Sequence, residues 1–138
     1  MYCYDCVCFT AEMVHVGSTY QGIVEWESCE NLPDRNVILT VTAVYHAPFF
    51  NSRVYVRATF VSDSTKFDLA HPVASAMHGY YSFADRKLVL LPDRAHSELH
   101  HPYSAICSFH FGDNDHADCT VNEVASLHQC AKARLVKV

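Results

Sequence analysis

The run Val37-Ile-Leu-Thr-Val-Thr-Ala43 alternates apolar and polar residues, and Arg53-Val-Tyr-Val-Arg-Ala-Thr-Phe60 repeats the pattern. Alternation with a period of two is typical of a β-strand that buries one face and exposes the other. β-Branched residues, which favour strands, are frequent in both runs. The loop from His46 to Ser52, with Pro48 as a strand breaker, joins them. The two runs therefore predict a β-hairpin within an all-β domain.

Further strand signals follow toward the C-terminus, and one helical signal interrupts them. Strands are predicted at Tyr80 to Phe83, at Lys87 to Leu91, along Ala105 to Phe111, and at Leu135 to Val138. Thr120 and Glu123 have the spacing of a capping box, and apolar residues follow at helical intervals. We therefore expect an antiparallel β-sandwich with one short helix near residues 120–131.

The chain length predicts a single domain. It has 138 residues, of which 50% are hydrophobic, which is enough for one core without a metal or disulfide. Residues 37–138 are expected to form the sandwich core. Residues 1–30 form either a cysteine-containing extension or the first strands.

The charge balance argues against two classes of partner. The formal net charge is −5, from 10 Lys and Arg against 15 Asp and Glu, with no basic cluster. Nucleic-acid binding depends on clustered cations that neutralise phosphates. No apolar run approaches the length of a membrane span. Neither nucleic acid nor a membrane is therefore expected as a partner.

Cysteine usage predicts a reduced, cytoplasmic protein. There are seven cysteines, an odd number, whereas a secreted disulfide scaffold has an even number. The first residues also lack the basic and apolar regions of a secretory signal. We therefore expect free thiols.

Four stretches of the chain resemble a C2 domain. They are Ile38 to Val44; Val54 to Arg57 with Val61 to Phe67; Tyr80 to Phe83 with Lys87 to Pro92 and Ser97 to Leu99; and Ile106 to Phe109 with Asp113, Asp115 and Asp118. The resemblance spans about residues 37–125 and implies a C2-like sandwich. It also implies a calcium site in loops that carry aspartates, and phospholipid binding through it.

The calcium ligands of that family are largely missing here. The loop from His46 to Ser52 contains no aspartate, so only Asp113, Asp115 and Asp118 match the family's ligand positions. Calcium takes six to eight oxygen ligands, which three carboxylates do not supply. Family members without these ligands act as calcium-independent protein-interaction modules. That function is predicted here, with a calcium- and phospholipid-binding C2 domain as an alternative.

A zinc site near the N-terminus is a second alternative. Cys3 and Cys6 have the spacing of zinc ligands, and His15 and Cys29 are candidates to complete a tetrahedral set. Such a site would make this chain a zinc-stabilised structural domain. The competing interpretation is that these cysteines are small apolar residues of the core. No other cofactor is predicted.

A third alternative is a cysteine-dependent hydrolase. Cys107 or Cys119 could serve as nucleophile, with His110, His116 or His128 as base. Cys107 with His110, and His116 with Cys119, also have the Cys-x-x-His and His-x-x-Cys spacing of metal ligands. No nucleophile elbow or oxyanion-hole segment accompanies them, so the chain is predicted not to be an enzyme.

Protein contacts are predicted at the central hairpin. Phe49 and Phe50 lie in its loop, and Arg53 and Arg57 lie on the polar face of the strand that follows. Aromatic residues and arginine are enriched at interfaces. The sequence therefore predicts a binding module, within a larger intracellular assembly or self-associating, that contacts its partner through these four residues.

Overall fold

Ten β-strands make up the regular structure of the residues described in this computed structural model. They are β1 (Tyr2–Tyr4), β2 (Val7–Phe9), β3 (Thr19–Trp26), β4 (Arg35–His46), β5 (Arg53–Ser62), β6 (Val73–Ser82), β7 (Lys87–Pro92), β8 (Tyr103–Phe109), β9 (His116–Glu123) and β10 (Gln129–Lys137). The described residues are 16–31, 33–46, 52–62, 73–93, 103–110 and 115–138, together with the backbone of β1 and β2. Among them, no helix could span a membrane.

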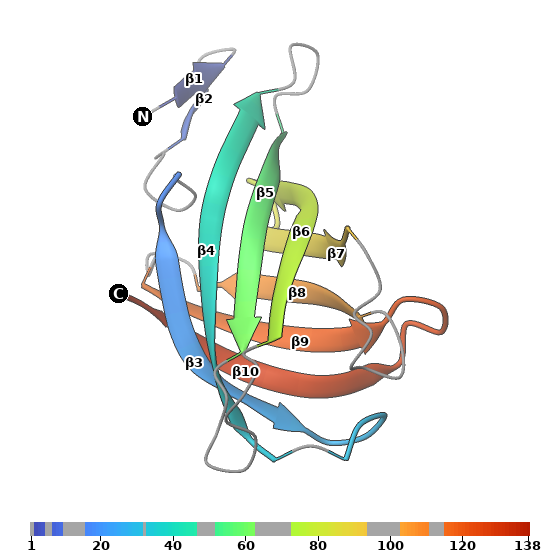
Figure 1. The fold of residues 1–138 in the computed structure, drawn as a ribbon. Helices are drawn as coiled ribbons and strands as arrows, with labels where there is room; N and C mark the ends of the chain where they lie inside the picture. The colour runs from blue at the N-terminus through green and yellow to red at the C-terminus, as the bar shows by residue number, and fades with distance from the viewer. Residues whose placement is uncertain are drawn as a thin grey trace.

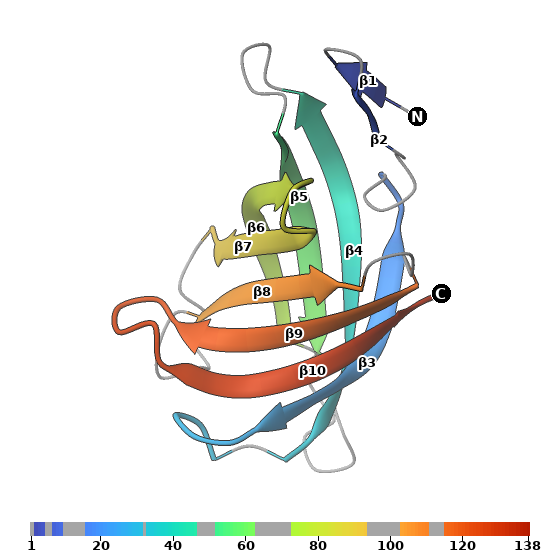
Figure 2. The ribbon, with the colours of Figure 1, turned by 180° about the vertical axis from the view of Figure 1, so that it is seen from behind.

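Strands β3 to β10 form a closed barrel in which every neighbouring pair is antiparallel (Figure 1). Strand order follows the chain, and β10 closes the barrel by pairing with β3. The closing register places Ala131 opposite Trp26 and Lys137 opposite Tyr20. Seen from behind, β8, β9, β10 and β3 form one continuous wall (Figure 2). The hairpin of β1 and β2 is a separate two-stranded sheet.

The closed barrel shows that the predicted C2-like β-sandwich was wrong. A sandwich consists of two sheets packed face to face, whereas each barrel strand here has a hydrogen-bonded neighbour on both sides. The all-β class was correct. Alternation of apolar and polar residues indicates which face of a strand is buried. It does not distinguish a sandwich from a barrel, because strands bury one face in both. The pairing of β3 with β10 joins segments more than 100 residues apart, which no local pattern encodes.

The helix predicted near residues 120–131 was also wrong. Thr120 and Glu123 belong to β9, and a turn leads from Val124 to Ser126 and on into β10. The buried residues of these strands recur every second position, as at Cys119 and Val121. A short isolated helix gains little in water, because its first turn is costly to nucleate. Pairing on both sides with β8 and β10 therefore outweighs the local helical signal.

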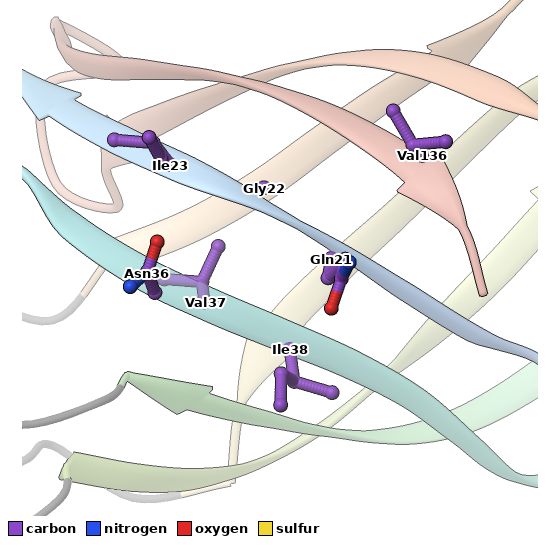
Figure 3. Close-up of a pocket in the computed structure, with 7 residues that line it drawn as sticks. All are labelled: Gln21, Gly22, Ile23, Asn36, Val37, Ile38 and Val136. Atoms are coloured by element: carbon purple, nitrogen blue, oxygen red, sulfur yellow. The ribbon is translucent and has the colours of Figure 1, made fainter.

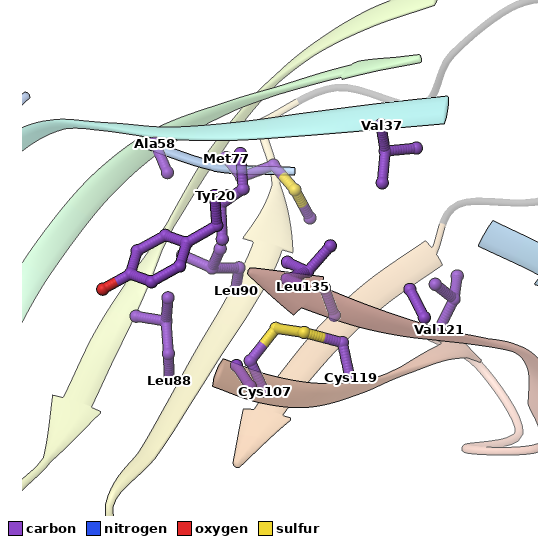
Figure 4. Packing of buried hydrophobic residues seen from close by; sticks show 14 of the residues in the cluster. Tyr20, Val37, Ala58, Met77, Leu88, Leu90, Cys107, Cys119, Val121 and Leu135 are labelled. Atoms are coloured by element: carbon purple, nitrogen blue, oxygen red, sulfur yellow. A yellow bond between two sulfur atoms is a disulfide. The ribbon is translucent and has the colours of Figure 1, made fainter. Parts of the chain in front are cut away.

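Inward side chains fill the barrel. The largest fully buried ones include Tyr20, Tyr81, Leu88, Leu90 and Leu135. Figure 4 shows several of them converging from strands that face each other across the interior. The Tyr20 and Tyr81 rings each pack edge-on against Phe109, at centroid distances of 5.6 and 5.9 Å. An eight-stranded barrel has an interior just wide enough for side chains to fill.

Four cysteines form two disulfides, so the prediction of free thiols was wrong for them. Cys107 of β8 and Cys119 of β9 are direct cross-strand partners and are bonded inside the barrel (Figure 4). Cys29, after β3, is bonded to Cys130 at the start of β10. The odd total of seven cysteines does not prevent pairing of four. The strand register identifies the first pair, and backbone hydrogen bonds from the turn after β3 to the Cys130 carbonyl place the second pair together.

Two consecutive leucines provide a test of the barrel's inside and outside. Leu90 is fully buried, whereas 41% of Leu91 is exposed. Leu90→Ala is expected to lower the free energy of unfolding by about 2–5 kcal/mol, because it leaves a cavity in the packed core. Leu91→Ala is the matched control and is expected to cost less than about 0.5 kcal/mol. Urea denaturation measures both, and equal losses would be incompatible with this barrel.

Candidate interaction surface

The closed barrel restricts how a partner can bind to it. Extended peptides often bind by adding a strand to a free sheet edge, where unpaired N–H and C=O groups await partners. Each of the strands β3 to β10 is paired on both sides over most of its length. The exception nearest the outer face of β4 is Ala43 to His46, which pair with β5 but lie beyond the register of β3 against β4, which ends at Thr40. A partner of the fully paired part of the wall therefore contacts outward side chains.

Three tyrosines form a row across the outer face of β4, β5 and β6. The strand register places Tyr45 opposite Tyr55 and Tyr55 opposite Tyr80. Tyr45 is 56% exposed and Tyr55 is 45% exposed, and Tyr80 is half-buried. Directly opposite residues in antiparallel strands lie close enough for their side chains to interact. The row is thus a contiguous aromatic strip on the barrel wall.

Arginines lie on both sides of this row. Arg53 and Arg57 share the outward face of β5 with Tyr55, while Val54 and Val56 point into the core. The Arg53 guanidinium stacks 4.5 Å from the centroid of the Tyr80 ring, a cation–π contact. We call Tyr45, Tyr55, Tyr80, Arg53 and Arg57 the tyrosine face.

Asp93 contacts the second arginine. Asp93 lies 3.5 Å from the Arg57 guanidinium and is hydrogen-bonded to the His78 ring at 2.5 Å. The register places His78 directly opposite Arg57. Exposed ion pairs contribute little to stability, because water screens them and holding the side chains costs entropy. The ion pair therefore adds little stability, and it places a carboxylate and an imidazole next to Arg57 beside the tyrosine row.

A β-bulge directs Tyr45 outward. In the first half of β4 the odd-numbered residues Val37, Leu39 and Val41 are buried. The register of β4 against β5 shifts between Val41 and Ala43, which adds one residue to β4. The shift reverses the alternation, so that Tyr45 joins the outer row. The sequence-based assignment of Ala43 to the buried face was wrong for this reason.

The other tyrosines whose side chains are described belong to the core. Burial raises the pKa of Tyr20 and of Tyr81 to about 12. Burial, reinforced by a hydrogen bond that Tyr103 donates to Glu30 at 2.9 Å, also raises the pKa of Tyr103. These phenols stay neutral at physiological pH and serve packing. Among the tyrosines with described side chains, the three of the tyrosine face are the ones whose rings reach the surface.

Two of the predicted contact residues belong to the tyrosine face. Arg53 and Arg57 lie there, whereas Phe49 and Phe50 fall outside the described residues, so their contacts stay predictions. Sequence reasoning missed the tyrosines. Tyr55 was recognisable, since it has the same parity as the two arginines. Tyr45 was not, because its orientation depends on the bulge.

A shallow depression of about 400 Å³ lies elsewhere on the barrel wall, over β3, β4 and β10 (Figure 3). Its lining residues are Gln21, Gly22, Ile23, Asn36, Val37, Ile38 and Val136. Ile23 and Ile38 are partly exposed, but the lining contains no aromatic ring and no charge. Interface hot spots are enriched in Trp, Tyr and Arg. The depression therefore fits a binding hot spot less well than the tyrosine face.

The predicted zinc ligands are not assembled within the described residues. Cys29 is bonded to Cys130, so its sulfur is not a free thiolate in this structure. The backbone places Cys3 in β1 opposite Cys8, and Cys6 and His15 fall outside the described residues. The N-terminal zinc site stays a prediction.

The predicted calcium ligand Asp118 lies in a cationic setting. Its carboxylate accepts hydrogen bonds from Arg134 at 3.1 Å and from His110 at 2.8 Å. The Arg134 bond, opposed by desolvation and reinforced by His110, lowers the pKa of this carboxyl group. A calcium ion would have to displace these donors. Asp115 precedes β9, and Asp113 falls outside the described residues.

The proposed cysteine nucleophiles are also paired in this structure. Cys107 and Cys119 are buried and bonded to each other, so neither presents a thiolate. Of the proposed bases, His110 contacts Asp118 and His128 contacts the Ser28 hydroxyl at 3.0 Å. In this structure neither cysteine is therefore a free nucleophile, and the expectation that the chain is not an enzyme stays a prediction.

Comparisons with known proteins identify one family. The sequence pattern of the family described as the C-terminus of the annelid erythrocruorin linker subunit matches residues 13–138, which is all but the first twelve residues of the chain. A comparison with curated proteins found no match. The family match replaces the C2 resemblance, which was wrong.

Proposed function

The chain belongs to the family of the annelid erythrocruorin linker C-terminus, and from this premise we propose that it is a protein-binding module that joins subunits of such an assembly. The family's name describes a linker subunit, which agrees with the protein-interaction module predicted from the sequence. The observation that carries the proposal is the tyrosine face. It combines exposed aromatic rings with two arginines, one stacked on Tyr80 and one beside Asp93.

The chemistry of the tyrosine face defines the partner surface that it fits. Tyrosine offers a large apolar ring with a polar end, and arginine pairs with carboxylates through a planar fork. We therefore propose a partner surface with apolar pockets bordered by Asp or Glu. The described part of the face needs no calcium for this recognition, so the binding is proposed to be calcium-independent.

The setting proposed for the protein is an oxidising compartment. Two disulfides support this, because cytosolic thiols are kept reduced in most organisms. The proposal differs from the cytoplasmic location that the cysteine count predicted. Binding of zinc at Cys3, Cys6, His15 and Cys29 and binding of calcium at Asp113, Asp115 and Asp118 remain secondary proposals.

Hydroxyl-radical footprinting tests the proposal on the intact chain. The chain is oxidised alone and after mixing with the remaining subunits of an annelid erythrocruorin. We expect Tyr45 and Tyr55 to react in the free chain and to become protected in the mixture. Leu127, which is 76% exposed and remote in sequence from the tyrosine face, is the internal control and should stay reactive.

The experiment tests two separate statements: that the chain binds the other subunits, and that it binds them through the tyrosine face. Absence of any complex by sedimentation would refute the linker function for this chain. A complex in which both tyrosines stay fully reactive, while other residues become protected, would refute the tyrosine face as the contact surface.

A further inference from the structure

A turn after β3 meets the start of β10 and brings three metal-binding side chains together. The backbone N–H groups of Glu27 and Ser28 both donate to the Cys130 carbonyl, at 2.8 and 3.1 Å. These bonds hold Cys29 beside Cys130, with 5.5 Å between their Cα atoms. The contact is backbone-mediated, so it does not depend on the disulfide alone.

His128 completes the group. The ligand atoms of Cys29, His128 and Cys130 all lie within 4.8 Å of one another. The Ser28 hydroxyl lies 3.0 Å from Nε2 of His128 and 3.7 Å from the Cys29 sulfur, so it contacts both ligand groups. Cys130 is fully buried, Cys29 is half-buried and His128 is exposed. Solvent therefore reaches the group from the histidine side.

The two turns that carry these residues have unusual backbone conformations. Cys29 has φ of 68° and Leu127, which precedes His128, has φ of 60°. Left-handed conformations are uncommon for residues other than glycine. Surrounding contacts must therefore hold both turns, which presents the ligand-bearing residues to each other.

We propose that reduction of the Cys29–Cys130 disulfide converts this group into a Zn²⁺ site. A dithiol reductant donates two hydrogens to the disulfide, leaving two thiols, and itself becomes a disulfide. Binding of Zn²⁺ then releases two protons, and the metal takes two thiolates and the His128 imidazole. Water or the Ser28 hydroxyl occupies the fourth position.

The geometry requires only a small rearrangement. Zinc–sulfur bonds of about 2.3 Å and zinc–nitrogen bonds of about 2.0 Å place tetrahedral ligand atoms roughly 3.5–4 Å apart. The ligand atoms already fall within 4.8 Å, and the two sulfurs separate once their bond is reduced. Metal would thus replace the disulfide as a link between the turn after β3 and β10.

This site differs from the zinc site predicted from the sequence, and it is independent of the tyrosine face. The two ligand sets share Cys29 only. To measure metal binding at the new site without binding at the N-terminal site, the N-terminal thiols must be removed. All measurements therefore use the full chain carrying Cys3→Ser, Cys6→Ser and Cys8→Ser, called the background chain.

Cobalt titration tests the site, because Co²⁺ bound to thiolates gives charge-transfer absorption. The background chain is reduced with dithiothreitol, desalted without air and titrated with Co²⁺ and then Zn²⁺. We expect one Co²⁺ per chain with a thiolate spectrum that Zn²⁺ removes, and no such spectrum in the oxidised chain. Cys130→Ser should abolish the spectrum, and His128→Ala should weaken binding at least tenfold. His116→Ala is the matched control and should leave it unchanged.

Thermal melting provides the second measurement if reduction loosens the fold. Zn²⁺ is expected to raise the melting temperature of the reduced background chain and not that of its reduced His128→Ala variant. The two chains should melt alike when oxidised. A reduced chain that gives neither a thiolate spectrum nor a zinc-dependent rise, or a response that survives both Cys130→Ser and His128→Ala, would overturn the proposal.

Discussion

Replacing Cys29 and Cys130 together with alanine is expected to lower the free energy of unfolding by about 5 kcal/mol, from the loop that the disulfide closes. The two residues are 101 positions apart, so the bridge restricts most of the unfolded chain. The bridge also connects the turn that follows β3 with the start of β10, and the pairing of β3 with β10 closes the barrel. Losing it therefore affects both the unfolded ensemble and the closure of the fold.

The second disulfide is the matched control for this prediction. Cys107 and Cys119 are only 12 positions apart, and the same loop argument gives about 3 kcal/mol for their replacement by alanine. Urea denaturation of both double variants measures the difference. A loss at the short-range pair equal to or greater than that at the long-range pair would contradict the loop-closure argument.

Replacing Tyr45 and Tyr55 with alanine is expected to weaken subunit binding by about 30-fold or more, which is the effect of truncating interface hot spots. Both rings are exposed in the free chain and lie directly opposite each other. Their truncation removes aromatic surface that would contact the partner, and it leaves no cavity in the core because neither ring is buried there. The fold should therefore remain intact, with an unchanged circular dichroism spectrum.

The control for this prediction is Ile23→Ala with Ile38→Ala in the depression over β3, β4 and β10. These residues are exposed to a similar extent, at 49% and 41%. Titration calorimetry against the remaining erythrocruorin subunits compares the two double variants. Weakening by the isoleucine pair with no effect of the tyrosine pair would move the interface to that depression.

Local pattern was a reliable guide where one strand face is buried. In β5 the alternation placed Val54, Val56 and Ala58 inside and the two arginines outside, and the structure agrees. The same reasoning failed at β9, where residues at helical spacing lie in a strand and a turn. Hydrogen bonds to β8 and β10 stabilise β9 as a strand, and a short local helical signal does not outweigh them.

The candidate site was only partly accessible to sequence reasoning. Arg53 and Arg57 were identified from their parity, but Tyr45 needed the bulge and Tyr80 needed the register of β6 against β5. The cysteine pairs depended in the same way on partners far along the chain. A single sequence contains no direct sign of which distant strands become neighbours.

The amino-acid sequence by itself determined an all-β domain, the buried face of its central hairpin and the outward arginines of β5. These follow from hydrophobic alternation, which is a local property. Only the tertiary structure decided that the strands close into a barrel, that four cysteines pair, and that three tyrosines align across β4, β5 and β6. Each of these depends on which distant strands become neighbours and in what register, and this is set by the burial of side chains contributed from the whole chain at once.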